Sequence, residues 1–232
     1  MVPLMQQCYE SAIAAKTLAT SIKKGAAASL SLALSHSIDL GLLAPCLAEV
    51  QRAFSGVQLQ VVRGTAGELA EQLKKGQVEF VVAGPLGAAW ERLDTWPLFE
   101  EELMLAVHPD HKLAGRNAVG PDQLAKEPIL TNSACESAAA LAELLEEHGL
   151  AAGGGHQVAC ERDLVTLIEA GIGVAFLPQS ALRGTGLRQV PVDGLELRRA
   201  VFLYGVAGRQ RSPVAEVFLK LARARDWLGQ GR

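Results

Sequence analysis

Short polar segments follow several predicted strands of this 232-residue chain, and they carry the side chains best suited to bind a small molecule. In an open α/β sheet, ligands bind beyond the carboxyl ends of the strands, where loops meet the starts of helices. Hydroxyl groups and free backbone N–H groups at such places suit carboxylates and other anions. The sequence therefore predicts a binding site whose candidate residues are Ser35, His36, Ser37, Gly64, Thr65, Thr131, Asn132, Ser133, Cys160 and Glu161.

Each candidate also has a purely structural interpretation, and the sequence leaves both open. Thr65 can simply cap a helix, while Asn132 and Ser133 suit a cap or a turn. His36 can be an exposed or hydrogen-bonded histidine; in a cleft, its titration near neutral pH would make anion binding pH-dependent. Glu161 can be a local charge at a helix start, whereas in a cleft it would favour a ligand with a donor or a positive group.

No pattern of residues predicts catalysis, a metal or a cofactor. The chain lacks G-x-S-x-G, a P-loop and H-E-x-x-H, and nothing assembles a nucleophile, a base and an orienting group. The run Gly153-Gly154-Gly155 follows a predicted helix, which favours a flexible connection over a dinucleotide fingerprint. HPDH, residues 108–111, could suggest a metal through its two histidines, but no further His or Cys cluster supports one. We therefore expect a protein that is not an enzyme and holds no cofactor.

The cysteine spacing indicates reduced thiols. Cys8, Cys46, Cys135 and Cys160 are far apart, with no C-x-x-C pair, which argues against a disulfide framework or a zinc site. Most buried cysteines act as small apolar side chains. Cys135 is the exception to consider, because it precedes a helix predicted from Ser137, whose dipole could lower the thiol pKa and allow a redox role.

Composition and charge exclude several classes of protein. A content of 49% apolar and 20% charged residues, with mean hydropathy +0.18, is typical of a folded chain. The longest uncharged run, residues 25–38, is shorter than the ~18–20 residues that span a bilayer. The net charge of −3 lacks the basic excess of a nucleic-acid footprint, and the N-terminus lacks the pattern of a signal peptide.

The elements that must position the candidate residues alternate between strand and helix. A leading helix over residues 3–24 carries one apolar stripe, which suits either an ordinary core helix or packing against a helix of a second subunit. The first half then predicts strands at 29–35, 57–63 and 78–85, with a helix capped by Asp39 and another opened by a Thr65–Glu68 capping box. This order favours right-handed crossovers and a parallel sheet.

The second half follows the same strand–helix pattern. Its predicted strands are 102–109, 127–131, 156–161, 172–178 and 197–206, and its predicted helices are 137–148, 162–171 and 212–228. Two similar α/β runs, followed by a final strand and helix, indicate two lobes. Because no connecting segment is long and polar enough to be a flexible linker, the lobes should be closely tied.

The order of these segments resembles the linker helix and effector-binding domain of LysR-type transcriptional regulators. The distinctive pieces are V-x-L-x-V-V-x-G-x-x-x-x-L-x-x-x-L-x-x-G (57–76), HPDHKLA (108–114) and DLVTLIEAGIGVAFLP (163–178). The family implies an α/β architecture of two Rossmann-like lobes, the type 2 periplasmic-binding-protein fold. It also implies that HPDH is a turn after a strand and that effectors contact the loops selected above.

The resemblance further implies a domain plan and partners. It divides the chain into a linker and dimerisation helix (1–25), lobe I (27–101 and 204–232) and lobe II (102–203), with a small effector between the lobes. Family members pair these domains antiparallel, so we expect a cytoplasmic homodimer or homotetramer. DNA contact would belong to a winged helix-turn-helix that this chain lacks. The alternatives are a solute-binding protein of a transporter and an enzyme on the same fold.

Overall fold

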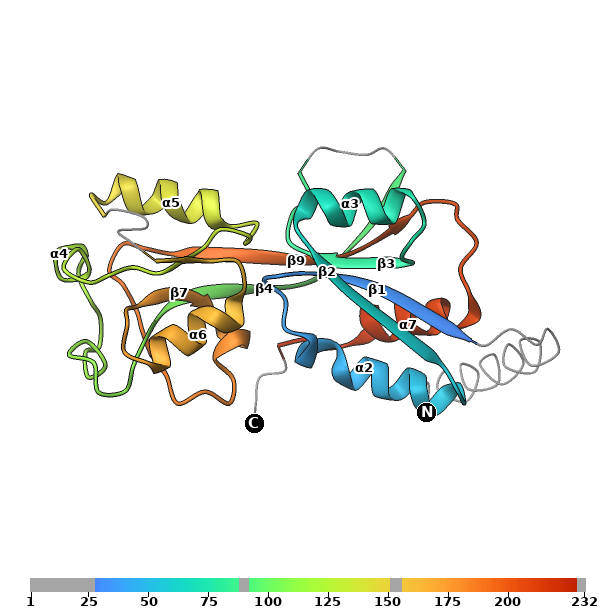
Figure 1. The fold of residues 1–232 in the computed structure, drawn as a ribbon, viewed down its shortest axis with the longest axis horizontal. Helices are drawn as coiled ribbons and strands as arrows, with labels where there is room; N and C mark the ends of the chain where they lie inside the picture. The colour runs from blue at the N-terminus through green and yellow to red at the C-terminus, as the bar shows by residue number, and fades with distance from the viewer. Residues whose placement is uncertain (1–27, 88–91, 151–155, 229–232) are drawn as a thin grey trace, which may run out of the picture.

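Two long antiparallel strands, β4 (Leu93–Val107) and β9 (Leu197–Val206), run between two α/β lobes (Figure 1). The computed structural model describes residues 28–87, 92–150 and 156–228. The predicted leading helix and the Gly153-Gly154-Gly155 run lie outside these residues. No helix of the described segments is long and apolar enough to cross a membrane.

The main sheet is mixed, with strand order β2-β1-β3-β9-β4-β7, and β8 also pairs with β4. The pairs β1–β2 and β1–β3 are parallel, as predicted, whereas β3–β9, β4–β9, β4–β7 and β4–β8 are antiparallel. A separate parallel pair, β5–β6, lies in the second lobe. The remaining strands are β1 (Ser29–Ser35), β2 (Gln58–Gly64), β3 (Phe80–Ala83), β5 (Thr131–Asn132), β6 (Gln157–Val158), β7 (Ala175–Pro178) and β8 (Arg188–Val190).

Helices cover both faces of the sheet in the first lobe, where α2 and α7 lie on one side and α3 on the other (Figure 1). In the second lobe, α5 and α6 lie on opposite sides of the strands (Figure 1). The helices are α2 (Leu40–Ala53), α3 (Ala66–Lys74), α4 (Pro121–Leu124), α5 (Ala138–Glu147), α6 (Glu161–Glu169) and α7 (Pro213–Ala224), with a 3-10 turn η1 (Gln179–Leu182).

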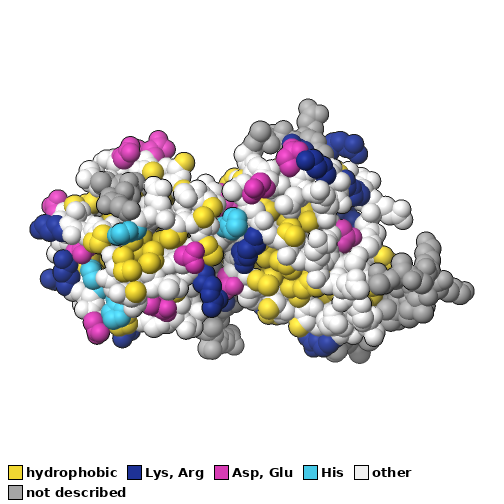
Figure 2. Space-filling view, in the orientation of Figure 1, with side chains coloured by type: hydrophobic (Ala, Val, Ile, Leu, Met, Phe, Trp, Pro, Cys, Tyr) yellow, Lys and Arg dark blue, Asp and Glu magenta, His cyan; other side chains and the backbone are white. Residues whose placement is uncertain are grey.

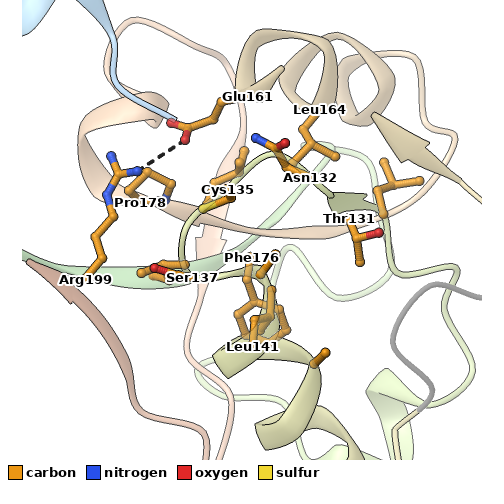
Figure 3. A pocket seen from close by; sticks show the side chains of 15 residues that line it. Thr131, Asn132, Cys135, Ser137, Leu141, Glu161, Leu164, Phe176, Pro178 and Arg199 are labelled. Atoms are coloured by element: carbon orange, nitrogen blue, oxygen red, sulfur yellow. Dashed lines mark hydrogen bonds and ion pairs between the residues drawn. The ribbon is translucent and has the colours of Figure 1, made fainter. Parts of the chain in front are cut away.

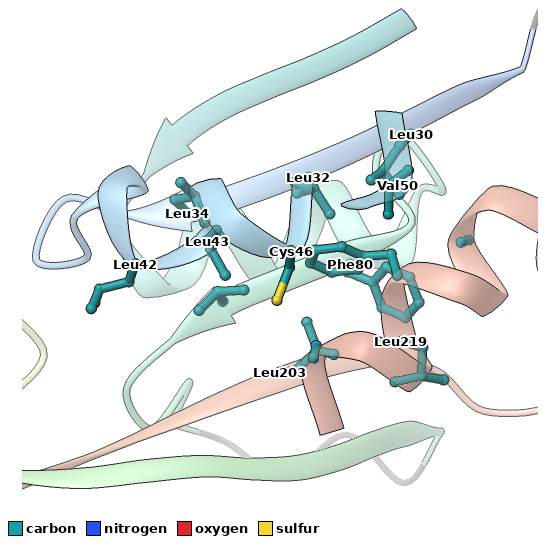
Figure 4. Packing of buried hydrophobic residues seen from close by; sticks show 14 of the residues in the cluster. Leu30, Leu32, Leu34, Leu42, Leu43, Cys46, Val50, Phe80, Leu203 and Leu219 are labelled. Carbon is teal, nitrogen blue, oxygen red and sulfur yellow. The ribbon is translucent and has the colours of Figure 1, made fainter. Parts of the chain in front are cut away.

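The alternation of SLSLALS in β1 explains how the first lobe is layered. Leu30, Leu32 and Leu34 point to the face covered by α2 and α7, where they pack with Phe80 (Figure 4). Ala33 points to the opposite face and packs in the cluster beneath α3. Because residues two apart in a strand share a face, the leucines build the core on one face, and Ala33 and the final serine of β1, Ser35, lie on the other.

The second lobe departs most from the predicted elements. The predicted strands 127–131 and 156–161 shrink to the two-residue strands β5 and β6. In contrast, β4 begins at Leu93 rather than at residue 102. The sequence of residues 93–101 does not predict a strand, because it mixes Pro97 with acidic and aromatic residues. In the structure these residues form a strand because they pair with β9.

Candidate functional site

Arg199 lies where the two lobes meet, and its guanidinium is buried. From β9 it donates to the Glu101 carboxylate on β4 through Nε (2.9 Å) and Nη2 (2.8 Å). Its Nη1 donates to the backbone oxygen of Ser37 (2.8 Å) and lies 3.4 Å from a carboxylate oxygen of Glu161. Glu101 also accepts from the backbone N–H and the hydroxyl of Ser180, both at 2.9 Å. These hydrogen bonds compensate the desolvation of a buried ion pair.

Glu161, the first residue of α6, lies at this junction and its carboxyl group has a raised pKa. Its side chain is 11% exposed, and burial raises its pKa to about 8, although the charge of Arg199 acts in the opposite direction. At neutral pH the group is therefore mostly protonated. A protonated carboxyl carries an O–H donor, so Glu161 can donate a hydrogen bond to an anion instead of repelling it.

Glu161 lines two cavities of different character. The smaller, about 40 Å³, is mostly apolar and lies in the second lobe beside Arg199 (Figure 3). The larger, about 440 Å³, is lined on one side by the loop after β1 and by Arg63 of β2, and on the other side by the α6 and η1 regions. Figure 2 shows basic, acidic and histidine side chains gathered at the waist of the molecule. The polar residues of the larger cavity are His36, Asp39, Arg63, Cys160, Glu161, Arg162, Thr166, Glu169, Arg183 and Thr185.

Asn132 lines the smaller cavity (Figure 3) and carries a hydrogen-bond donor that is not used by any described residue. The residue is 8% exposed, and its Oδ1 accepts from the backbone N–H of Ala134 at 3.0 Å. Its Nδ2 is buried and has no hydrogen-bond partner within the described part of the chain. A buried donor without a partner costs about 1–3 kcal/mol. A ligand oxygen at this point would remove that penalty.

The neighbours of Asn132 in the predicted loop behave differently from one another. Thr131 lines the same cavity as Asn132. Ser133 is exposed and lines neither cavity, because its backbone N–H and its hydroxyl both bond to the Val158 oxygen, at 2.9 and 3.3 Å. For Ser133 the structure therefore favours the turn interpretation.

The serines after β1 are buried, and their hydroxyls are already engaged. Ser37 Oγ donates to the Glu136 carboxylate at 2.7 Å, and Ser35 Oγ lies 3.0 Å from Ser37 Oγ. The same Glu136 accepts from the Gly84 backbone N–H, after β3, at 3.3 Å. Tyr204 OH donates to the Gly84 oxygen at 2.9 Å, and burial raises the pKa of this phenol to about 12. These predicted donors thus face a carboxylate of the protein itself.

The loop after β2 is also occupied by a protein carboxylate. The backbone N–H and the hydroxyl of Thr65 both donate to Glu68, at 2.8 and 3.0 Å, and these bonds lower the pKa of Glu68. The predicted capping box is confirmed for its glutamate, but the Thr65 hydroxyl caps no helix N–H. A Cβ on Gly64 would lie 3.1 Å from the same carboxylate. Neither Gly64 nor Thr65 lines either cavity.

Two of the described cysteines, Cys135 and Cys160, line different cavities. Cys160 lines the larger cavity and Cys135 the smaller. Burial raises the pKa of the Cys135 thiol, so the expected lowering by the helix dipole is wrong: desolvation outweighs it at this position. Within the described ranges no three His, Cys, Asp or Glu side chains are grouped to hold a metal ion.

Several residues of the site were not predicted from the sequence. Arg199 and Glu101 face each other only through the antiparallel register of β9 and β4, in which Arg198 likewise faces Glu102. The available signal was a run of charges inside two otherwise apolar strands. Arg63 was missed for a similar reason: its Nη1 reaches back to the oxygens of Ser35 and Ile38, both at 2.9 Å, across the β1–β2 pair.

Two α/β lobes joined by long crossing strands, with a cavity between them, define the class of two-lobed small-molecule-binding domains. Residues 23–227 match the LysR substrate binding domain, and the chain belongs to this family. It is 27% identical over 193 residues to the HTH-type transcriptional regulator TtuA of Agrobacterium vitis, covering 80% of this chain and 64% of that protein. The chain thus spans less than two thirds of this relative's length.

Solved structures show the same fold. The regulatory domain of Synechocystis PCC6803 CcmR in complex with 2-PG aligns with TM-score 0.73 and 19% identity over 85% of this chain and 96% of that one. The effector binding domain of QuiR in complex with shikimate aligns with TM-score 0.72 and 15% identity over 86% and 97%. The fold is the type 2 periplasmic-binding-protein fold, as the sequence resemblance implied. The chain is therefore a LysR substrate-binding domain.

Proposed function

We propose that the effector is a small anion, held between the lobes by donors from both sides. The observation that carries this proposal is the buried Nδ2 of Asn132, which has no protein partner in the described residues; Asn132 itself lines the smaller cavity beside Arg199. Glu161, largely neutral because of its raised pKa, adds a second donor. Arg63, Arg162 and Arg183 line the adjoining larger cavity, where they outnumber by one the two described carboxyl side chains other than Glu161, which are Asp39 and Glu169.

Occupancy of this site would act on the relative position of the lobes. A ligand shifts a conformational equilibrium only by its differential affinity for the two states, and a ligand that contacts both lobes has such a difference. We take lobe I as 27–101 and 204–232, lobe II as 102–203 and residues 1–25 as the linker. The signal would pass through that linker to a DNA-binding segment outside this chain, in a cytoplasmic homodimer or homotetramer.

A transporter solute-binding protein and an enzyme on the same fold are the alternatives. Relatives found by sequence, such as TtuA, are transcription regulators, which supports the regulator over both. The described site also holds donors and one buried ion pair, an arrangement suited to binding.

A thermal-shift experiment tests the effector. We expect one member of a panel of small carboxylates, aromatic acids and amino acids to raise the melting temperature of the wild-type chain in a saturable manner, since a ligand of the folded state stabilises it. Asn132→Asp keeps the acceptor for Ala134 but removes the Nδ2 donor, so it should abolish this shift. The exposed Asn117→Asp adds the same charge elsewhere and should leave the shift intact. A broad panel without any stabiliser would refute an anionic effector.

A further inference from the structure

Glu136 connects the two lobes. It belongs to the segment between β5 and α5, yet its carboxylate reaches the loops that follow β1 and β3. There Oε2 accepts from Ser37 Oγ at 2.7 Å and Oε1 accepts from the Gly84 N–H at 3.3 Å. Both oxygens of one carboxylate are therefore bonded to the opposite lobe.

The groups that receive Glu136 form a cradle built for a carboxylate. We define the cradle as Ser35, Ser37 and Gly84. Because Ser37 Oγ gives its proton to Glu136, Ser35 Oγ must be the donor in the 3.0 Å contact between the two hydroxyls. This chain of O–H groups is polarised toward the carboxylate, which strengthens each bond. Ser35 and Ser37 are 0% and 2% exposed, so water does not compete for them.

Gly84 allows the close approach of Glu136. A Cβ at residue 84 would lie 3.2 Å from the Glu136 Cβ, closer than nearly all such contacts. The Tyr204 hydroxyl bonds to the Gly84 oxygen at 2.9 Å and so fixes the orientation of this loop. The cradle therefore belongs to the first lobe, and the carboxylate that fills it comes from the second.

We propose that Glu136 is an internal occupant of this cradle and that a carboxylate-bearing effector competes with it. This inference rests on the proposed function and adds a regulatory step to it. While Glu136 fills the cradle, its hydrogen bonds to Ser37 and Gly84 hold the two lobes together, and we call these two bonds the clasp. When an effector carboxylate takes the same donors, the two bonds of Glu136 break and the clasp is released. Glu68 at Thr65 provides a contrast, because it is a carboxylate bonded within its own lobe and holds nothing across the cleft.

Chemical rescue tests the cradle directly. Glu136→Ala leaves room for a free carboxylate, so sodium acetate should raise the melting temperature of this variant more than sodium chloride at equal ionic strength, and saturably. The control Glu143→Ala, at an exposed position of α5, should respond equally to both salts. The double variant S37A/E136A should lose the acetate effect. Equal responses of the Glu136 and Glu143 variants would overturn the proposal.

A second measurement remains available should Glu136→Ala fail to fold. Glu136→Gln keeps the side-chain volume but lacks the charge, so the Gly84 amide should exchange its hydrogen at least tenfold faster than in the wild-type chain. The panel ligand identified above should bind this variant at least tenfold more tightly, because its competitor is weakened. Unchanged exchange and unchanged affinity would overturn the clasp.

The outcomes separate this inference from the proposed function. If a panel ligand stabilises the wild-type chain but binds Glu136→Gln no more tightly, the effector site stands and the clasp is wrong. If acetate rescues Glu136→Ala while no panel ligand stabilises any variant, the cradle stands and the anionic effector is wrong.

Discussion

At the residue scale, the site is governed by buried charges whose partners come from distant parts of the chain. Arg199 forms an ion pair with Glu101 and lies 3.4 Å from the carboxyl group of Glu161, which is mostly protonated at neutral pH. The strand-end rule found Glu161 and the polar residues around it, because it needs only the positions of strands and helices. It could not find Arg199, since that residue lies inside a strand and reaches the site through the pairing of β9 with β4.

Arg199→Met should destabilise the chain strongly. The variant removes the guanidinium of Arg199 and leaves the buried Glu101 carboxylate without a positive partner. Breaking a buried pair in this way lowers the free energy of unfolding by about 3–5 kcal/mol. The matched control is Arg198→Met: Arg198 is bonded to Glu102 at 2.7 Å, but both side chains are more than half exposed. An exposed pair contributes less than ~1 kcal/mol. Urea unfolding of both variants measures the difference, and equal losses would contradict the role given to the buried pair.

Glu161 should make stability fall as the pH rises. Its pKa is about 4.3 in an unfolded chain and about 8 here, so between these values the folded state holds the extra proton. The free energy of unfolding then decreases with pH until the folded group also ionises. Glu161→Gln cannot ionise; it should match the wild-type chain near pH 5 and exceed its stability near pH 9 by on the order of a few kcal/mol.

Melting curves across this pH range check the titration of Glu161. Glu169→Gln, at an exposed position of the same helix, should follow the wild-type curve throughout. A Glu161→Gln curve parallel to the wild-type one would show that the group is already ionised at neutral pH.

At the element scale, agreement between prediction and structure follows the strength of local patterns. The strands 29–35 and 197–206 have the predicted bounds, because their alternating or continuous apolar residues match a half-buried or buried strand. The short β5 and β6 were overestimated, since apolar residues near them fill the core from irregular segments: Ile129 makes only an isolated bridge with Val174.

Gly173→Ala tests this irregular contact. A Cβ at residue 173 would lie 2.5 Å from the backbone oxygen of Pro128, which no side-chain movement can relieve. We expect a loss of roughly 1–3 kcal/mol in the free energy of unfolding, the usual effect of overpacking. Gly186→Ala has nothing within 4 Å of its Cβ and should change stability by less than about 0.5 kcal/mol. Denaturant unfolding should show this difference between the two variants.

At the scale of the whole molecule, the arrangement of the sheet points to one exposed edge. Strand β2 ends the order of the main sheet and exposes Leu59, one of two large apolar side chains that are markedly exposed among the described residues. Edge strands with exposed apolar side chains tend to pair with another chain. This edge suits the dimer that we propose for the family fold.

Leu59→Glu should weaken that dimer. Light scattering coupled to size exclusion should give a dimer or larger for the wild-type chain and a smaller species for this variant. Ile172→Glu is the control, because Ile172 is 41% exposed against 46% for Leu59 but precedes β7, at the opposite end of the sheet order from β2. A wild-type monomer, or equal effects of both variants, would refute an interface at this edge.

The sequence by itself determined the family and the two-lobed α/β plan, because these depend on local periodicity and on the order of elements along the chain; that an anion binds at the loops it selected is our proposal. The tertiary structure decided which groups meet at the site. It joined Arg199 to Glu101, brought Glu136 to Ser37 and left the Asn132 donor without a partner. These contacts depend on strand register and lobe packing over many intervening residues, and no local pattern encodes them.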